Sequence, residues 1–95
     1  MTESDIEKFK KTLQNKLNIL GPKKIKGLTK LEVIDVGFER SIWEGHPGSM
    51  DITIDPEFDF KDGYDTTWHS RTQSFTRNLA SALLQNETRI YVFFR

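Results

Sequence analysis

The sequence predicts an α+β fold: a two-layer sandwich with two helices on one face of an antiparallel or mixed sheet. Two segments, near the start of the chain and at 67–86, repeat apolar residues at helical spacing. Between them, the segment 31–60 is β-branched, aromatic and partly alternating, which is typical of strands. A last apolar segment, 88–95, also has β character. The expected order is therefore α-β-β-(β)-α-β, where the bracket marks one optional extra strand.

The first helix is expected to begin at Ser4 and to end near Leu20. Ser4 and Glu7 have the spacing of a capping box, in which the two residues satisfy each other's backbone N–H groups. One apolar stripe follows at helical spacing and comprises Ile6, Phe9, Leu13, Leu17 and Leu20. Gly21 and Pro22 come next, and both residue types favour the end of a helix.

The segment 31–43 reads as β structure whose alternation changes phase. Its apolar residues are odd-numbered at first, as at Leu31 and Val33, and even-numbered later, as at Val36. A bulge or bend near residues 35–37 would explain this, because one extra residue moves the following side chains to the other face. One bent strand and two short strands both fit the pattern.

Residues 50–60, MDITIDPEFDF, alternate most regularly. Every even position is apolar or proline, and every odd position is polar and mostly acidic. We expect the even-numbered side chains to meet the helices and the odd-numbered ones to meet solvent. Pro56 has no N–H group for a strand ladder, so it should lie on an edge or where the pairing ends.

A second helix is expected over 67–86. Its predicted buried face comprises Trp68, Phe75, Leu79, Ala82 and Leu83. The last segment, TRIYVFFR at 88–95, is apolar on both faces, which is usual for a strand in the interior of a sheet.

Length and composition restrict the class of protein. A chain of 95 residues is expected to form one domain, 1–95, with a modest core. The absence of cysteine excludes disulfides and thiolate chemistry and favours a cytoplasmic location. No apolar run approaches the ~18 residues of a membrane span. The N-terminal segment lacks the apolar region of a secretory signal, and no cofactor motif occurs.

Charge is segregated along the chain, although the net charge is +0. Residues 8–30 contain eight lysines and no acid, whereas residues 32–65 contain ten acids and two basic residues. Residues 66–95 are mildly basic again, with four arginines and one acid. Such segregation bears on partners and association rather than on the fold.

The acidic face of 50–60 is the surface that we expect to carry function. Carboxylates two residues apart on a strand lie ~6.6 to 6.8 Å apart and form a row that a basic protein could contact. We therefore expect a non-enzymatic protein-binding module, of a size that fits an inhibitor or accessory factor encoded by a virus or mobile element. The predicted contact residues are Asp51, Asp55, Glu57 and Asp59, bordered by Arg40 and Trp43 if the strands form a hairpin. The simplest alternative is that this face is only the solvated side of a sheet.

The lysine-rich segment offers a second function. Its lysines could contact the phosphates of a nucleic acid, and the residues we single out are Lys23, Lys24, Lys26 and Lys30. The segment GPKKIKG lacks the glycine–lysine spacing of a phosphate-binding loop. A homodimer in which the basic and acidic surfaces meet is a further alternative.

Catalysis and metal binding have weaker support. Glu44, His46 and His69, with Arg40 and Arg71, are the residue types of a small ribonuclease, but nothing in the sequence brings them together. Asp59, Asp62 and Asp65 are oxygen ligands without the spacing of a calcium loop. We therefore expect neither an enzyme nor a metal site.

Overall fold

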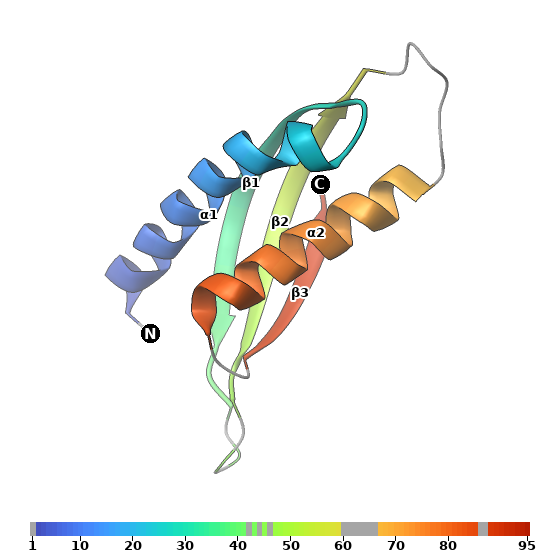
Figure 1. The fold of residues 1–95 in the computed structure, drawn as a ribbon. Helices are drawn as coiled ribbons and strands as arrows, with labels where there is room; N and C mark the ends of the chain where they lie inside the picture. The colour runs from blue at the N-terminus through green and yellow to red at the C-terminus, as the bar shows by residue number, and fades with distance from the viewer. Residues whose placement is uncertain (1, 42, 44, 46, 60–66, 86–87) are drawn as a thin grey trace.

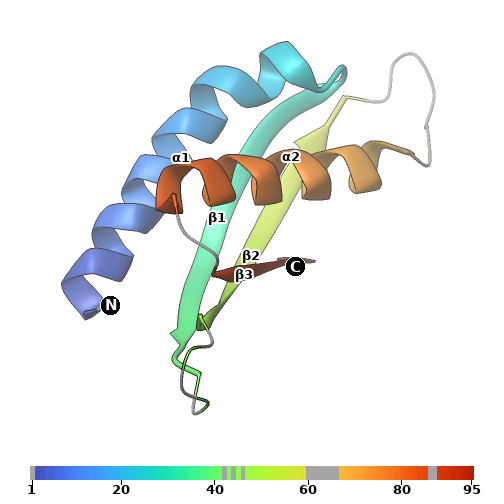
Figure 2. The same cartoon turned by 60° about the horizontal axis from the view of Figure 1, so that its bottom comes forward.

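The computed structural model describes residues 2–41, 43, 45, 47–59, 67–85 and 88–95. Its elements are α1 (Glu3–Lys24), β1 (Leu28–Glu39), β2 (Ser49–Phe58), α2 (Thr67–Leu84) and β3 (Arg89–Phe94). The three strands form one sheet, and both helices lie on the same face of it (Figure 1, Figure 2). This is the predicted α+β architecture, and the optional extra strand does not occur among the described residues.

The sheet is mixed, with the order β1-β2-β3. β1 and β2 pair antiparallel as a hairpin, whereas β2 and β3 run parallel and are connected through α2, because a parallel pair needs a crossover. The prediction that 88–95 lies inside the sheet is wrong, since β3 is an edge strand. Both its faces are apolar for different reasons: Val92 packs in the core, whereas Tyr91 and Phe93 are exposed on the other face.

β1 is one long strand, and its register with β2 shifts at two places. One shift lies between Leu28 and Lys30. The other lies between Val33 and Asp35, slightly before the predicted position, so Ile34 is the extra residue of this bulge. Val33 and Val36 are therefore both buried, although one is odd-numbered and the other even-numbered. The phase change in the sequence is the direct signature of this bulge.

The capping box of α1 is formed by Thr2 and Asp5, not by Ser4 and Glu7. The Asp5 N–H donates to Thr2 Oγ1 at 3.2 Å, and the Thr2 N–H donates to Asp5 Oδ2 at 3.2 Å. Both pairs have the same spacing in the sequence, so the pattern alone could not separate them. The hydrogen bonds from the backbone and hydroxyl of Thr2 lower the pKa of Asp5 below its usual 3.8.

α1 continues past its predicted end at Leu20, through Gly21 and Pro22, to Lys24. Pro22 has no N–H for the helical ladder, but the helix ends one turn later, where the Ile25 N–H donates to the Gly21 carbonyl at 2.9 Å. Gly21 is buried, and a Cβ atom there would lie 3.2 Å from a methyl carbon of Leu28. This close packing against the start of β1 explains how the helix persists through two helix-ending residues.

The core lies between the helices and the inner face of the sheet, with β2 as the central strand. Met50, Ile52 and Ile54 have no exposed surface, which confirms the predicted inward face. The pairing of β2 with β3 ends at Ile54, so Pro56 lies where β2 has no neighbour on that side and its missing N–H disrupts no ladder.

Neither helix in the described part of the chain has the length and the apolar character that a membrane span requires.

The buried stripe of α2 differs from the predicted one. It comprises Trp68, Thr72, Thr76 and Ala80, at intervals of four residues. Phe75, Leu79 and Leu83 are only partly buried, and Ala82 is exposed. Each threonine hydroxyl donates to the carbonyl four residues earlier, Thr72 to Trp68 at 2.7 Å and Thr76 to Thr72 at 2.8 Å. This bond lets a polar side chain enter the core, and an apolar-periodicity rule does not detect it.

Candidate functional site

The face of the sheet opposite the helices carries the acidic residues of β1 and β2. The antiparallel register places odd-numbered β2 residues on this open face, directly opposite residues of β1. The carboxylates on these strands are Glu32, Asp35 and Glu39 of β1 and Asp51, Asp55 and Glu57 of β2. Within β1 and β2, Lys30 is the single basic residue. We call this surface the acidic face.

Like charges oppose each other on the acidic face. Glu32 lies directly across from Asp55, and like charges directly opposite each other destabilise an antiparallel pair. Only Lys30, opposite Glu57, forms a cross-strand pair of opposite charge between β1 and β2. The arrangement therefore concentrates negative charge at some cost to the stability of the sheet.

An aromatic strip borders the acidic face on β3. Tyr91 and Phe93 are 46% and 51% exposed, respectively. The parallel register sets Tyr91 beside Asp51 and Phe93 beside Thr53, so the rings and the carboxylates share one surface. Exposed aromatic residues in such a setting are typical of the centres of protein interfaces.

A pocket of about 470 Å³ lies at the hairpin end of the acidic face. Its lining includes Arg40 and Trp43, together with Arg89 and Tyr91 of β3. Trp43 is 70% exposed, and its N–H donates to Ser41 Oγ at 3.1 Å. The sequence places Arg40 and Trp43 near this face but does not bring Arg89 and Tyr91 next to them, because the parallel placement of β3 has no local signal.

Asp59 lies just outside β2, at the opposite end of the acidic face from the pocket. Its N–H donates to the Gly27 carbonyl at 2.7 Å, which ties the end of β2 to the connector after α1. Gly27 has φ +87°, and a Cβ atom there would lie 3.1 Å from the Trp68 ring. Of the predicted contact residues, Asp51, Asp55 and Glu57 thus share the acidic face, whereas Asp59 lies beyond its end.

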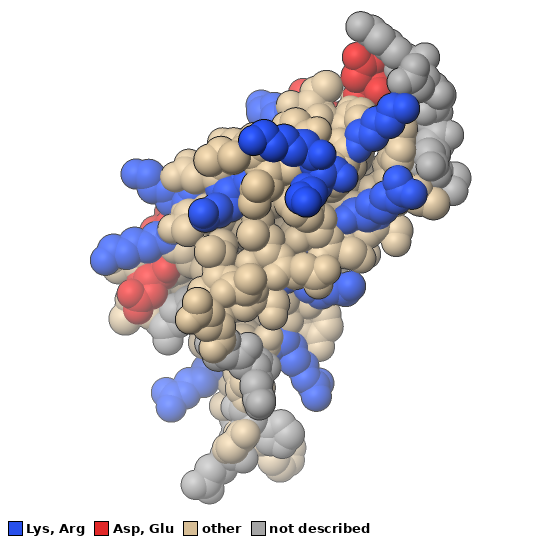
Figure 3. All heavy atoms as spheres, viewed as in Figure 1, with Lys and Arg blue, Asp and Glu red and all other residues tan. Residues whose placement is uncertain are grey.

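The helix layer carries the opposite charge. Lys and Arg side chains spread over both helices, with few acidic side chains near the margins of this view (Figure 3). After Glu7, neither α1 nor α2 contains an acidic residue. The exposed basic residues on the two helices are Lys8, Lys11, Lys16, Lys23 and Lys24 of α1 and Arg71 and Arg77 of α2. We call this surface the basic helix face.

The four lysines predicted to bind nucleic acid do not form one surface. Lys23 and Lys24 lie in the last turn of α1, and Lys26 lies in the connector that follows. Lys30 lies on β1 opposite Glu57, on the acidic face. The sequence does not group the arginines of α2 with the predicted nucleic-acid-binding lysines, because the two sets lie far apart along the chain.

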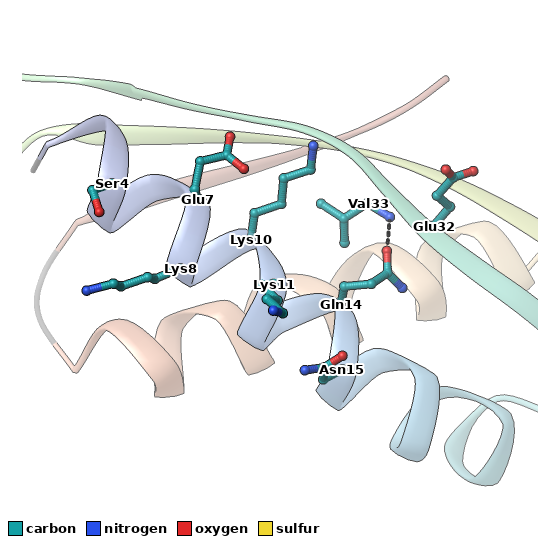
Figure 4. Close-up of a pocket in the computed structure, with 9 residues that line it drawn as sticks. All are labelled: Ser4, Glu7, Lys8, Lys10, Lys11, Gln14, Asn15, Glu32 and Val33. Carbon is teal, nitrogen blue, oxygen red and sulfur yellow. Dashed lines mark hydrogen bonds between the residues drawn. The ribbon is translucent and has the colours of Figure 1, made fainter.

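A polar groove of about 510 Å³ runs between α1 and the outer edge of β1 (Figure 4). Gln14 Nε2 donates to the Leu31 carbonyl at 2.8 Å, and Gln14 Oε1 accepts from the Val33 N–H at 2.6 Å. Lys10 Nζ donates to the Ile34 carbonyl at 3.1 Å. Gln14 and Lys10 are thus held by the strand backbone and attach α1 to the edge of β1.

The residues considered for catalysis are not assembled in the part of the chain that the structure describes. Glu44 and His46 lie outside the described residues. His69 is exposed on α2, and its ring packs edge-to-face on Phe94 at 5.0 Å and on Phe58 at 5.8 Å. This aromatic packing is a structural role for the imidazole.

The aspartates considered as metal ligands cannot be compared as a set, because Asp62 and Asp65 lie outside the described residues. Among the described residues, no group of three or more histidine, cysteine, aspartate or glutamate side chains could hold a metal ion.

The comparisons with known proteins give no match: no family model, no curated protein and no solved structure matches this chain.

Proposed function

We propose that this chain is a non-enzymatic protein-binding module that docks a positively charged protein on its acidic face. One observation carries the proposal: the two strands bring six carboxylates to an uncovered surface, with Glu32 directly opposite Asp55. A sheet adapted only to solvent would gain stability by pairing opposite charges across the strands. Retaining a repulsive arrangement fits a surface adapted to a partner, since functional sites commonly reduce stability.

The neighbouring groups support the same mode of binding. The exposed rings of Tyr91 and Phe93 offer apolar contact area beside the carboxylates, and aromatic anchors often dominate the energy of an interface. The negative charge would steer a basic partner and set the salt dependence of association. The pocket lined by Trp43 and Arg89 offers a recess for a partner side chain. A small inhibitor or accessory factor acting in the cytoplasm fits these features.

The test replaces Asp51 and Asp55 together by lysine. Lys at position 55 would face Glu32 and convert repulsion into attraction, so we expect the fold to persist, as circular dichroism would show. The matched control carries Glu3→Lys and Glu7→Lys, the same charge change on the first turns of α1.

Each protein is immobilised and exposed to nuclease-treated lysate, and bound proteins are identified by mass spectrometry. We expect a basic protein that the native chain and the control retain and that the Asp51→Lys, Asp55→Lys variant loses. Failure to find any protein that distinguishes this variant from the control would contradict the proposal.

The basic helix face favours a second candidate function, the binding of a nucleic acid. The supporting observation is that both helices lack acidic residues after Glu7, so that lysines of α1 and arginines of α2 form one positive surface (Figure 3). Phosphate contacts on such a surface would make binding steeply dependent on salt. No phenylalanine, tyrosine or tryptophan side chain on α1 or α2 is exposed, so this binding would be electrostatic and weakly selective for sequence.

The test measures fluorescence anisotropy of a short labelled RNA and of a DNA duplex between about 50 and 200 mM salt. We expect affinity to fall with salt and to be reduced at least tenfold by Arg71→Glu with Arg77→Glu. The variant Lys30→Glu, which changes a lysine on the acidic face, is the control and should bind as the native chain does. No binding at the lowest salt would rule out this candidate.

A further inference from the structure

The backbone groups at the two edges of the sheet are covered by helix side chains to different extents, and this difference points to a second contact surface. The outer edge of β1 is covered by α1: the amide of Gln14 takes the place of a neighbouring peptide by bonding to Leu31 and Val33, and Lys10 bonds to Ile34. These side chains form hydrogen bonds with backbone N–H and C=O groups of β1 that would otherwise be available to pair with another strand. β1 is therefore closed to further pairing along this stretch.

The outer edge of β3 has little cover. The Arg89 N–H donates to Gly48 at 3.2 Å and the Arg95 N–H donates to Ile54 at 2.9 Å, so the odd-numbered peptide groups of β3 point towards β2. Because the backbone N–H and C=O groups of successive residues point to opposite sides of a strand, those of the even-numbered residues point outwards. The residues whose backbone faces outwards are Ile90, Val92 and Phe94.

One contact partly closes this edge. Gln73 Nε2 donates to the Val92 carbonyl at 2.7 Å. Among the described residues, this is the only hydrogen bond recorded to the outward backbone groups of Ile90, Val92 and Phe94. An apolar edge strand of this kind is a template for pairing with another chain.

We propose that β3 pairs antiparallel with β3 of a second copy of this chain, about a twofold axis at Tyr91. In this register, Ile90 would form a hydrogen-bonded pair with Val92 of the partner subunit, and the reverse pair would follow by symmetry. The two three-stranded sheets would become one continuous sheet, with both acidic faces on the same side. This proposal concerns a different contact from the docking surface proposed above.

Side-chain chemistry fits a second copy in this register. Tyr91 would lie opposite Tyr91 of the partner subunit, and Arg89 would lie opposite Phe93 of the partner subunit, so each guanidinium meets an aromatic ring. Moving the axis to Val92 would instead set Arg89 opposite Arg95 of the partner subunit, a repulsive pair. A basic strand from another protein would meet the same repulsion, because Arg89 and Arg95 flank this edge.

Substitutions at Gln73 and Tyr91 test the proposal, because they should change the affinity of the dimer in opposite directions. Pairing needs the Val92 carbonyl that Gln73 occupies in the single chain, so Gln73→Ala should make the dimer about fivefold tighter. Tyr91→Lys would place two ammonium groups opposite each other at the axis and should weaken the dimer at least tenfold. The control is Thr53→Lys, which puts a lysine on the same face next to Phe93 but on the central strand.

The measurement is sedimentation equilibrium of the purified chain from micromolar to millimolar concentration, without any partner. We expect a monomer–dimer equilibrium that Gln73→Ala shifts towards the dimer, that Tyr91→Lys shifts towards the monomer, and that Thr53→Lys leaves unchanged. Amide exchange should show the Val92 N–H protected only at high concentration. A native chain and a Gln73→Ala variant that both remain monomeric would overturn the proposal, as would a dimer that Tyr91→Lys does not weaken.

Discussion

Asp5 shows how a single side chain sets the start of an element. Its carboxylate accepts the Thr2 N–H and its own N–H is capped by the Thr2 hydroxyl, so the first turn of α1 depends on the charged form of this residue. These hydrogen bonds hold the pKa of Asp5 below 3.8 in the folded protein. A group whose folded pKa is lowered stabilises the fold above its unfolded pKa, and the contribution is lost as the pH falls.

We therefore predict that Asp5→Asn removes part of the pH dependence of stability below pH 3.8. The difference in unfolding temperature between the native chain and the variant should be largest near neutral pH and should shrink as the pH falls through and below 3.8. Glu3→Gln, a carboxyl-to-amide change in the same turn but outside the capping box, is the control. A difference between native and Asp5→Asn that stays constant with pH would contradict this assignment.

At the level of the residue, the sequence predicts apolar burial better than polar burial. The alternation of 50–60 identifies Met50, Ile52 and Ile54 as core residues, because their apolar character and spacing agree. Thr72 and Thr76 are also fully buried, but their burial depends on hydrogen bonds to the preceding helical turn. Composition and periodicity do not report such bonds.

At the level of the element, α1 acts as the cover of the β1 edge as well as a packing layer. The Leu31 carbonyl and the Val33 N–H, on the outer edge of β1, both form hydrogen bonds with the Gln14 side chain. If Gln14 is replaced by alanine, these two backbone groups must bond to water or lack a hydrogen-bond partner. The local structure of β1 next to its bulge thus depends on a helix side chain.

We predict that Gln14→Ala lowers the free energy of unfolding by about 1–2 kcal/mol, since the two partly buried hydrogen bonds to Leu31 and Val33 are lost together with an exposed one to Asn18. Chemical denaturation measures this change, and hydrogen exchange should show faster exchange of the Val33 amide. Asn15→Ala, at the next and exposed position of the same helix, should leave both measurements nearly unchanged. Unaltered exchange at Val33 in Gln14→Ala would mean that the Gln14 contact does not hold this edge.

The order of the strands was the least predictable property of the elements. The sequence indicates that 88–95 is a strand, but its two apolar faces suggested a central position, whereas β3 is at the edge. The misleading residues are Tyr91 and Phe93, which are apolar yet exposed. Hydropathy alone does not distinguish an exposed aromatic residue from a core residue.

At the level of the whole molecule, the fold converts segregation along the sequence into segregation between faces. Lysines of α1 and arginines of α2, far apart in the chain, meet on the basic helix face, while the acids of β1 and β2 meet on the acidic face. The sequence reveals the charge blocks but not that Lys30 belongs with the acids, since this depends on the hairpin register. A neutral chain can therefore offer two surfaces for partners of opposite charge.

A chain of this size has a single small core between these two faces, so its stability should depend strongly on the central strand. We predict that Ile52→Ala lowers the free energy of unfolding by about 2–5 kcal/mol, because Ile52 has no exposed surface on β2. That loss is a large part of the roughly 5–15 kcal/mol that holds a typical domain together. Ile19→Ala is the matched control: Ile19 is 59% exposed on α1, and the change should stay within about 0.5 kcal/mol. Urea denaturation of both variants measures the difference, and equal effects would mean that the core does not lie between the helices and β2.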